Sequence, residues 1–304
     1  MTKNSYHIPV MLKESIEGLR VAEGGIYVDA TYGGGGHSDA ILQRLGSGKL
    51  VAFDQDDDAG KNLPDDKRLI FVNHNFRYLK NFLKYYGLIP ADGILADLGV
   101  SSHQIDKSER GFSTRYDGPL DMRMNRSAAR SAETVIRDYE IERLASVFRL
   151  YGELRNARRV AGIIAETREN LSIDSTHKLV DALKPLAPRG RENKFYARVF
   201  QALRIEVNDE LASLKALLEQ ATEVLKPGGR LVVISYHSLE DRLVKNFMKT
   251  GNFEGIQEKD FFGRQISPLN PVLKMQIPGP DEIRDNSRAR SAKLRIAEKT
   301  DKEK

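Results

Sequence analysis

Short apolar runs without polar alternation recur along the chain at Ile26–Asp29, Leu50–Asp54, Gly93–Asp97 and Arg230–Ser235. Such runs are typical of parallel strands that are buried on both faces, and a fifth run, Leu69–Val72, has the same character. The pattern predicts an open, mostly parallel α/β sheet, in which ligands bind beyond the carboxyl ends of the strands. Because Asp29, Asp54 and Asp97 end the first three runs, we expect their carboxylates to face one crevice.

The middle of the chain has a helical rather than a strand-like period. Apolar residues within Ile141–Phe148 follow the i, i+3, i+4, i+7 spacing of an amphipathic helix. The strand-like pattern returns after Leu211–Leu225, a predicted helix that ends before Pro227. We therefore predict that a helical subdomain, residues 106–200, is inserted into an α/β core made of residues 1–105 and 201–304.

A glycine-rich turn follows the first predicted strand. Gly33–Gly36 come a few residues after Asp29, and an apolar stretch typical of a helix comes next. The order strand, glycine turn, helix is how an α/β sheet brings its backbone close to a bound nucleoside or nucleotide, although a flexible surface loop is the alternative. Asp54 ends the second predicted strand, where an acid accepts hydrogen bonds from ribose hydroxyls. The turn therefore predicts a site for either NAD or S-adenosyl-L-methionine.

Two features favour the methyl donor over the dinucleotide. The glycines are contiguous, whereas a pyrophosphate-binding turn spaces them as Gly-x-Gly-x-x-Gly. In addition, Leu225-Lys-Pro-Gly-Gly-Arg-Leu231 looks like the turn that leads into a strand in Rossmann-like methyltransferases. A methyltransferase is therefore the preferred interpretation, and an NAD-dependent dehydrogenase is a distant alternative.

Composition narrows the class of protein further. The chain has 304 residues, no cysteine and six scattered histidines, so a disulfide framework is excluded and no metal site is expected. No apolar run is long enough to cross a membrane and the first residues lack a signal-peptide core, which predicts a cytoplasmic protein with no membrane partner. Residues 251–280 are rich in glycine, proline and aromatic residues and are expected to loop over the surface.

The positive charge is concentrated in the predicted insertion. The whole chain has a net charge of +5. Residues 106–200 alone carry 14 acidic residues and 19 basic residues, and 15 of the basic residues are arginine. Arginine favours bidentate contacts with phosphate and stacking on bases. The distribution predicts a polyanionic substrate, and a solvated helical surface with ordinary charge pairs is the alternative.

Eight segments in order along the chain resemble the bacterial 16S ribosomal RNA cytosine-N4 methyltransferase family. They are His7–Glu14, Tyr27–Ser38, Gly93–Ser102, Glu109–Ser113, Asp117–Met124, Phe200–Leu211, Ile234–Arg242 and Arg288–Arg295. Two segments depart from the family pattern. Lys194–Arg198 replaces the usual Lys-His-Pro-Ala-Thr-Arg stretch, and His103 replaces the proline after the Ser-Ser pair. Both departures concern the substrate side rather than the class of reaction.

The resemblance implies a Rossmann-like class I methyltransferase core with an inserted helical subdomain. It implies transfer of a methyl group from S-adenosyl-L-methionine to the exocyclic N4 of a cytidine (position 1402 in the usual RNA numbering) in the 16S RNA of the small ribosomal subunit. The cofactor contacts carried over by motif are Gly34, Gly35, Gly36, His37, Asp54, Phe76, Asp97 and Gln104. Within this set, Phe76 is either a stacking partner of adenine or a core aromatic, and Gln104 either reads a base or is a plain loop amide.

The reaction itself needs little acid–base help. Methyl transfer is an in-line displacement, so positioning of donor and acceptor supplies much of the acceleration. An acceptor at the N4 hydrogen would free the nitrogen lone pair for attack. The Asn/Asp-Pro-Pro-Tyr motif that supplies such an acceptor in DNA amino-methyltransferases is absent. We expect the loop from Asp97 to Ser102 to supply it, through backbone carbonyls or Ser101 first and the Asp97 carboxylate second, with His237 and Tyr236 as contacts to the base.

The target base must leave its stack to reach the methyl group, and arginines are expected to hold the flanking phosphates. The predicted RNA-binding residues are Arg110, Arg115, Arg123, Arg126, Arg158 and Arg159. Each is alternatively half of a surface ion pair. Two other functions remain open: a methyltransferase that acts on another RNA, DNA or protein, and a non-catalytic ribosome-assembly factor that binds RNA. The sequence does not decide between a monomer and a homodimer.

Overall fold

The computed structural model describes residues 9–301, so the predicted family segment His7–Glu14 begins outside the described residues. The chain divides into two compact units. The first unit is Met1–Gly99 together with Leu211–Lys304, and the second is Val100–Glu210.

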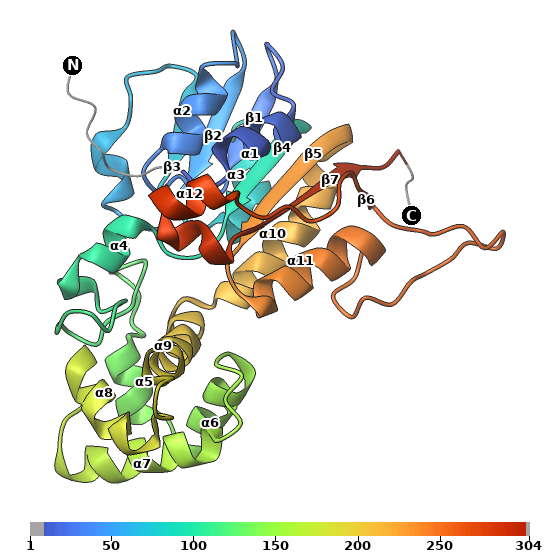
Figure 1. The fold of residues 1–304 in the computed structure, drawn as a ribbon. Helices are drawn as coiled ribbons and strands as arrows, with labels where there is room; N and C mark the ends of the chain where they lie inside the picture. Colours follow the sequence, from blue (N-terminus) through green and yellow to red (C-terminus); the bar gives the residue numbers. More distant parts are fainter. Residues whose placement is uncertain (1–8, 302–304) are drawn as a thin grey trace. The chain divides into compact units, whose positions relative to one another are not determined.

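The first unit is built on one mixed sheet, which has seven strands within the described part of the chain (Figure 1). The strand order is β3-β2-β1-β4-β5-β7-β6. The bounds are β1 Ile26–Asp29, β2 Lys49–Phe53, β3 Leu69–Val72, β4 Ala91–Asp97, β5 Leu225–Ser235, β6 Leu269–Pro271 and β7 Lys293–Lys299. Strands β1 to β5 pair in parallel, and β7 pairs antiparallel with both β5 and β6. The predicted mostly parallel, Rossmann-like α/β class is confirmed.

Helices cover both faces of this sheet, which explains why its strands read as continuous apolar runs. Successive strand residues point to opposite faces, so Val28 belongs to one apolar cluster and Tyr27 to the other. The first cluster includes Leu214 of α10, and the second includes Ile16 of α1. The helices of the unit are α1 Leu12–Leu19, α2 Gly36–Leu42, α3 Leu79–Tyr85, α10 Glu210–Val224, α11 Ser238–Thr250 and α12 Pro280–Asp285, with short 3-10 turns at Ala59–Asn62, Phe76–Tyr78 and Ser287–Ser291.

The predicted turn before β5 is instead an irregular part of the strand. Ala91 of β4 pairs with Leu225, but Gly93 pairs with Arg230, so the register shifts across Lys226–Gly229. The sequence signal for a turn is correct locally, because Gly228 has φ +75°. The chain nevertheless returns to the same neighbouring strand on both sides of the irregularity, which a local motif does not reveal.

The second unit is helical, and the amphipathic helix predicted at Ile141–Phe148 is confirmed as part of α6. Its apolar core includes Phe148 and Leu144 of α6 and Val160 of α7. The elements are α4 Ser102–Asp106, α5 Ala132–Asp138, α6 Ile141–Leu150, α7 Ala157–Asn170, α8 Thr176–Leu183 and α9 Glu192–Asn208, with 3-10 turns at Ser108–Arg110 and Lys184–Leu186. No helix in residues 9–301 has the length and apolar character that a membrane crossing requires.

The segment that departs from the family pattern contributes to this core. Lys194–Arg198 lies in α9, where Phe195 and Tyr196 are both buried and join the apolar cluster of the unit. Their rings meet at a centroid distance of 5.5 Å. The departure therefore supplies packing to the helical unit.

Candidate functional site

The ends of β1, β2 and β4 bring acidic residues to one edge of the sheet. Asp29 is the last residue of β1 and pairs with Ala52 of β2 and Leu95 of β4, so Asp54 and Asp97 follow two residues further on along each neighbour. Because the strands are parallel, these ends lie at the same edge. The structure thus brings the three predicted acids into one region of the first unit.

Asp29 does not face a crevice, which corrects the expectation for that residue. Its side chain has no exposed surface. One carboxylate oxygen accepts a hydrogen bond from the Thr31 N–H at 3.1 Å and the other accepts one from the Ser38 hydroxyl at 2.7 Å. Burial raises the pKa of this carboxyl. Asp29 therefore holds the start of the glycine turn against α2, and only Asp54 and Asp97 remain for a ligand.

The glycine turn requires glycine for steric reasons at two positions. Gly35 has φ +80°, and a Cβ there would lie 2.7 Å from the Tyr32 hydroxyl. At Gly36 a Cβ would lie 2.6 Å from Pro9 Cγ. By contrast, the nearest atom to a Cβ built on Gly33 is 3.9 Å away. The Gly33 side of the turn is therefore open to a ligand, whereas Gly35 and Gly36 are packed against their own chain.

Asp54 is tied directly to this turn. Its carboxylate accepts hydrogen bonds from the Gly33 N–H at 2.8 Å and from the Asp56 N–H at 2.9 Å. The side chain is half-buried, and burial raises its pKa to about 6, although the two N–H donors oppose the rise. A carboxylate beside an open stretch of backbone is suited to accept hydrogen bonds from a ribose diol.

The loop after β3 is fastened to the loop after β2. The Asn75 amide donates to the Gln55 side-chain oxygen at 2.9 Å, and the Asn75 oxygen caps the 3-10 turn that begins at Phe76. Phe76 is partly buried and packs against the core cluster that contains Val28. Both readings of Phe76, as a core aromatic and as a partner of adenine, fit this placement, and its cofactor role stays a prediction.

Asp97 lies in a polar cluster at the end of β4. Its N–H donates to the Thr31 hydroxyl at 2.7 Å, which joins the ends of β4 and β1. One carboxylate oxygen accepts a hydrogen bond from the Tyr236 hydroxyl at 2.7 Å, and the other lies 3.9 Å from His37 Nδ1. Burial raises the pKa of Asp97 to about 6. Burial and the neighbouring Asp97 raise the pKa of Tyr236, so its phenol is a neutral donor at physiological pH.

His37 is buried at the start of α2. Its Nε2 lies 3.2 Å from the Val10 carbonyl oxygen, so the ring links the N-terminal segment of the described chain to the glycine turn. With Nε2 held by a carbonyl, Nδ1 faces Asp97. The sequence placed His37 among the cofactor contacts. The structure places it beside Asp97, and direct contact with a cofactor stays a prediction.

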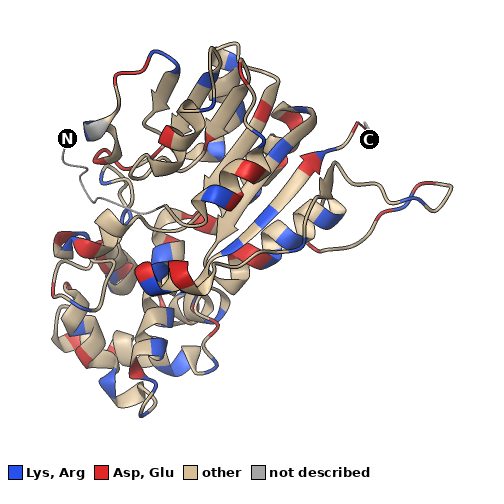
Figure 2. Ribbon diagram, turned by 45° about the horizontal axis from the view of Figure 1, so that its top comes forward, with Lys and Arg blue, Asp and Glu red and all other residues tan. Residues whose placement is uncertain are grey.

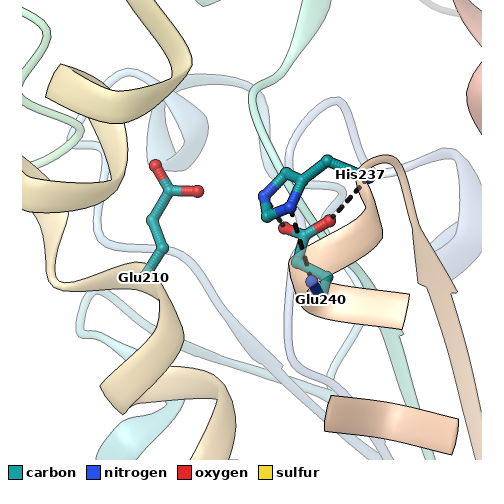
Figure 3. A group of neighbouring side chains, drawn as sticks. All are labelled: Glu210, His237 and Glu240. Carbon is teal, nitrogen blue, oxygen red and sulfur yellow. Dashed lines mark hydrogen bonds and ion pairs between the residues drawn. The ribbon is translucent and has the colours of Figure 1, made fainter. Parts of the chain in front are cut away.

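His237 caps α11 and is paired with Glu240 (Figure 3). Its Nδ1 accepts the Glu240 N–H at 3.4 Å, and its Nε2 lies 3.2 Å from the Glu240 carboxylate. The same carboxylate accepts the N–H of Tyr236 at 2.9 Å. Glu240 thereby fixes both aromatic residues that follow β5. Sequence reasoning missed Glu240, although the His-x-x-Glu spacing is that of a capping box.

Ser101 and Gln104 form a capping box of their own in the second unit. The Ser101 hydroxyl accepts the Gln104 N–H at 3.2 Å, and the Gln104 side-chain oxygen accepts the Ser101 N–H at 3.1 Å. Gln104 is buried. The pair therefore starts α4, and a catalytic role for Ser101 and a cofactor contact for Gln104 stay predictions.

Two of the predicted phosphate-binding arginines serve the second unit's own structure. Arg110 is only 1% exposed and donates to the carbonyl oxygens of Arg123 and Met124. Arg123 forms a two-pronged pair with Asp121 and also donates to the carbonyls of Arg126 and Ala128. Their donors are used within the unit, so the structure gives both side chains a role in packing, and RNA binding by Arg110 and Arg123 stays a prediction.

The other predicted arginines are exposed. Arg115 and Arg159 face solvent, Arg126 lies 3.3 Å from Glu109, and Arg158 lies 4.0 Å from Glu142 with 82% of its side chain exposed. Basic and acidic residues are interspersed over the ribbon (Figure 2). Exposed pairs of this kind are weak, so these guanidinium groups are available to a phosphate.

The polar groups at the sheet edge fit the cofactor that the sequence implies. S-adenosyl-L-methionine presents hydroxyls, a positively charged sulfonium and amine, and a carboxylate. Asp54 and Asp97 supply hydrogen-bond acceptors and negative charge. The turn at Gly33 leaves space for a ligand to approach the backbone. Two residues that position this set, Thr31 and Tyr32, were not singled out from the sequence. Their signal was only their place between the strand and the glycines.

Known proteins resemble this chain over nearly its whole length. The sequence model of a family described as the MraW methylase family matches residues 4–300. A protein of Parabacteroides distasonis named ribosomal RNA small subunit methyltransferase H is 57% identical over 297 residues, which cover 97% of each chain. Proteins of the same name from Phocaeicola vulgatus and Christiangramia forsetii are 57% and 55% identical, over 98% and 97% of this chain and 98% of each relative.

Proposed function

Because the chain belongs to the MraW methylase family, we propose that it methylates the exocyclic N4 of a cytidine in the 16S RNA of the small ribosomal subunit. The family assignment made from the sequence is confirmed, and with it S-adenosyl-L-methionine as the cofactor. The small-subunit RNA as substrate is supported by the names of relatives at 55–57% identity. The N4 atom is what the resemblance of the eight sequence segments to the cytosine-N4 methyltransferase family implies.

The observation that carries the proposal is the hydrogen bond between Asp54 and the Gly33 N–H. It joins the two elements that the sequence assigned to the cofactor, the glycine turn and the acid after β2. In this reading Asp54 accepts the ribose hydroxyls, the open backbone at Gly33 faces the methionine carboxylate, and Phe76 lies against adenine. The bound cofactor supplies an electrophilic methyl group. The residues of the chain orient the two reactants and exclude water.

Asp97 is the proposed acceptor next to the reacting atoms. Its pKa of about 6 leaves the carboxylate ionised at pH 7.5, and the Tyr236 hydroxyl holds one of its oxygens at 2.7 Å. The second oxygen, which lies 3.9 Å from His37 Nδ1, is proposed to accept a hydrogen from an amino group, either that of the cofactor or N4 of the base. Ser101 and the backbone carbonyls of the 97–102 loop are the alternative acceptors.

The substrate-binding role of residues 106–200 rests on exposed arginines. Arg115, Arg126, Arg158 and Arg159 are proposed to bind phosphates of the RNA substrate, and the arginines that serve the fold of the unit are left out of this set. Phosphate binding predicts a salt dependence of RNA affinity whose slope falls by about 0.7 for each single-strand contact removed. A slope that is unchanged when Arg158 and Arg159 are both replaced by glutamine would exclude them.

The direct test is transfer of a labelled methyl group to small-subunit particles isolated from cells that lack this gene. Modified nucleosides are then mapped by mass spectrometry. The proposal expects one new N4-methylated cytidine, and it expects Asp97→Asn to reduce single-turnover transfer about 100-fold or more, the size of effect typical of a lost charge-stabilising contact. Label on another nucleoside or on protein would establish a different substrate, and the absence of any label would favour a binding role in ribosome assembly.

A matched variant separates the role of Asp97 from that of the pocket wall. Tyr236→Phe removes only the hydrogen bond to Asp97, so it should lower the transfer rate by a smaller factor than Asp97→Asn and leave cofactor affinity nearly unchanged. If Tyr236→Phe lost cofactor affinity as severely as Asp97→Asn, Asp97 would be assigned to binding of the cofactor rather than to the target base.

A further inference from the structure

The loop between α11 and β6 contains a short β-hairpin, residues 259–265, whose tip exposes two phenylalanines. Figure 1 shows this segment extending away from the sheet past the end of α11. At its tip Phe261 is 99% exposed and Phe262 is 77% exposed. Single exposed apolar residues are ordinary, but two adjacent aromatic rings without a packing partner in the core are typical of an interaction site. Their exposure is not used by the fold or by the proposed methyl transfer.

The tip is held in a defined conformation by its own hydrogen bonds. Lys259 and Gln265 form an antiparallel bridge, and the Gly263 N–H donates to the Asp260 carbonyl at 2.9 Å. The Asp260 carboxylate accepts the N–H groups of Phe262 and Arg264 at 2.9 and 2.8 Å. Aspartate at the first position and glycine at the fourth are the preferred residues of this tight turn. Binding through the tip therefore loses less conformational entropy than binding through an unstructured loop.

Positive charge surrounds the hairpin. Residues 242–274 contain six basic and three acidic residues, and the carboxylate of Asp260 is already used by backbone donors. The Arg264 guanidinium lies 5.6 Å from the centre of the Phe262 ring. An aromatic face flanked by a cation is suited to a base with its phosphate.

A basic groove lies against the base of the hairpin, and Gln265 belongs to both. The groove has a volume of about 810 Å³. Lys245 and Lys249, four residues apart on one face of α11, form one side of it together with Lys274 from the following loop. All three lysines are exposed, and none forms an ion pair with a carboxylate among residues 9–301. Buried Met248 and Leu269 line the groove as well.

We infer that the hairpin tip and the basic groove together bind a single strand of RNA. Phosphates would contact Lys245, Lys249 and Lys274, and unpaired bases would stack on Phe261 and Phe262. The combination of unpaired lysines with exposed aromatic rings favours this ligand over a protein, whose surface would not need three free cations beside the rings. The inference rests on the proposed function, since it assigns part of the RNA substrate to the first unit, but it is tested by binding alone.

The test measures binding of the full-length protein to a fluorescein-labelled single-stranded RNA of about 12 nucleotides, a length that spans one such surface. One variant carries Phe261→Ala and Phe262→Ala, and its matched control is Tyr85→Ala, an aromatic residue 82% exposed elsewhere on the first unit. A second variant carries Lys245→Gln and Lys249→Gln. Its control carries Lys67→Gln and Lys84→Gln. These substitutions remove the same charge from exposed lysines that are distant from α11 along the chain.

The phenylalanine variant should bind the RNA at least about fivefold more weakly, which corresponds to loss of one stacked base. The lysine variant should reduce the slope of log affinity against log salt by about 1.4, as expected for two released contacts on a single strand. Both controls should bind like the parent, and all four proteins should unfold at the parent's temperature, because every substituted side chain is exposed.

Equal RNA binding by the parent and both hairpin and groove variants would overturn the inference. Normal RNA binding with lost association to ribosomal particles would also overturn it, because the surface would then bind a protein. If the protein failed to methylate ribosomal RNA while the variants still lost affinity for the oligonucleotide, the RNA surface would stand and the proposed function would fall. The two ideas therefore have separate readouts.

Discussion

Replacement of Asp54 by asparagine tests the physical basis of the site, because it should make the protein more stable and its cofactor binding weaker. Asparagine keeps the size and shape of the side chain but removes the charge. In the folded chain that charge is half-buried beside the glycine turn, and its pKa is raised from 3.8 to about 6. A rise of this size means that the ionised carboxylate costs the folded state about 3 kcal/mol.

The net effect is smaller, because the amide has only one oxygen. Asp54 accepts one N–H from Gly33 and one from Asp56, and asparagine loses one of these acceptors at a cost of about 1 kcal/mol. We therefore expect Asp54→Asn to raise the free energy of unfolding by about 2 kcal/mol at pH 8 without cofactor. The sign follows from the raised pKa. Below about pH 4 the carboxyl is protonated in both states, the penalty grows as pH rises toward 6, and it is complete above that value.

Cofactor binding should change in the opposite direction. Loss of a charge-assisted hydrogen bond to a ribose hydroxyl costs about 1.5–3 kcal/mol, or roughly 10- to 100-fold in affinity. Calorimetric titration at pH 8 measures the affinity, and urea unfolding at pH 4 and pH 8 measures the stability. An asparagine variant that is less stable than the parent at pH 8 would contradict the argument from charge burial. A change in affinity below about threefold would remove Asp54 from the ribose.

Three further outcomes follow from the same structure. Cofactor affinity of the parent should fall about tenfold between pH 7.5 and pH 5 as Asp54 takes up a proton, and titrations of Asp54→Asn over the same range should lack that part of the decline. Arg110→Ala should lower the free energy of unfolding by about 3 kcal/mol, because a buried and a partly buried hydrogen bond to backbone carbonyls are lost together with a buried side chain, whereas exposed Arg115→Ala should change it by less than about 0.5 kcal/mol in the same denaturant titration. Gly35→Ala should lower the melting temperature and weaken cofactor binding, because its φ of +80° and the buried Tyr32 ring leave no room for a methyl group; a melting temperature equal to the parent's would show that the turn relaxes.

Much of the first unit was predictable because its sequence signals are local. A buried parallel strand needs a continuous apolar run, and the runs that end at Asp29, Asp54 and Asp97 correspond to β1, β2 and β4. The helix in the middle segment was equally predictable from its apolar spacing, since one face of α6 is buried in the core of the second unit. The irregularity in β5 was not predictable, because the pairing of Leu225 with Ala91 depends on a strand that is far away in sequence.

The candidate site shows the same division. Its members could be named from strand ends and a glycine run, but their roles depended on burial. Asp29 and Asp54 have the same local signature, yet one is sealed against Ser38 and the other borders an open turn. The arginines divide in the same way, since Arg110 and Arg115 are five residues apart and only the second reaches solvent.

The order of amino acids established the class of fold, the family and the cofactor, because each depends on patterns that are read along a few consecutive residues. The tertiary structure decided which individual side chains are buried in packing contacts and which are accessible to a ligand. Exposure and pKa depend on what distant segments pack around a group, as Tyr236 and His37 do around Asp97. A carboxylate or a guanidinium has the same chemistry at every place in the chain, and the neighbours that the fold brings to it determine whether that chemistry is available to a ligand.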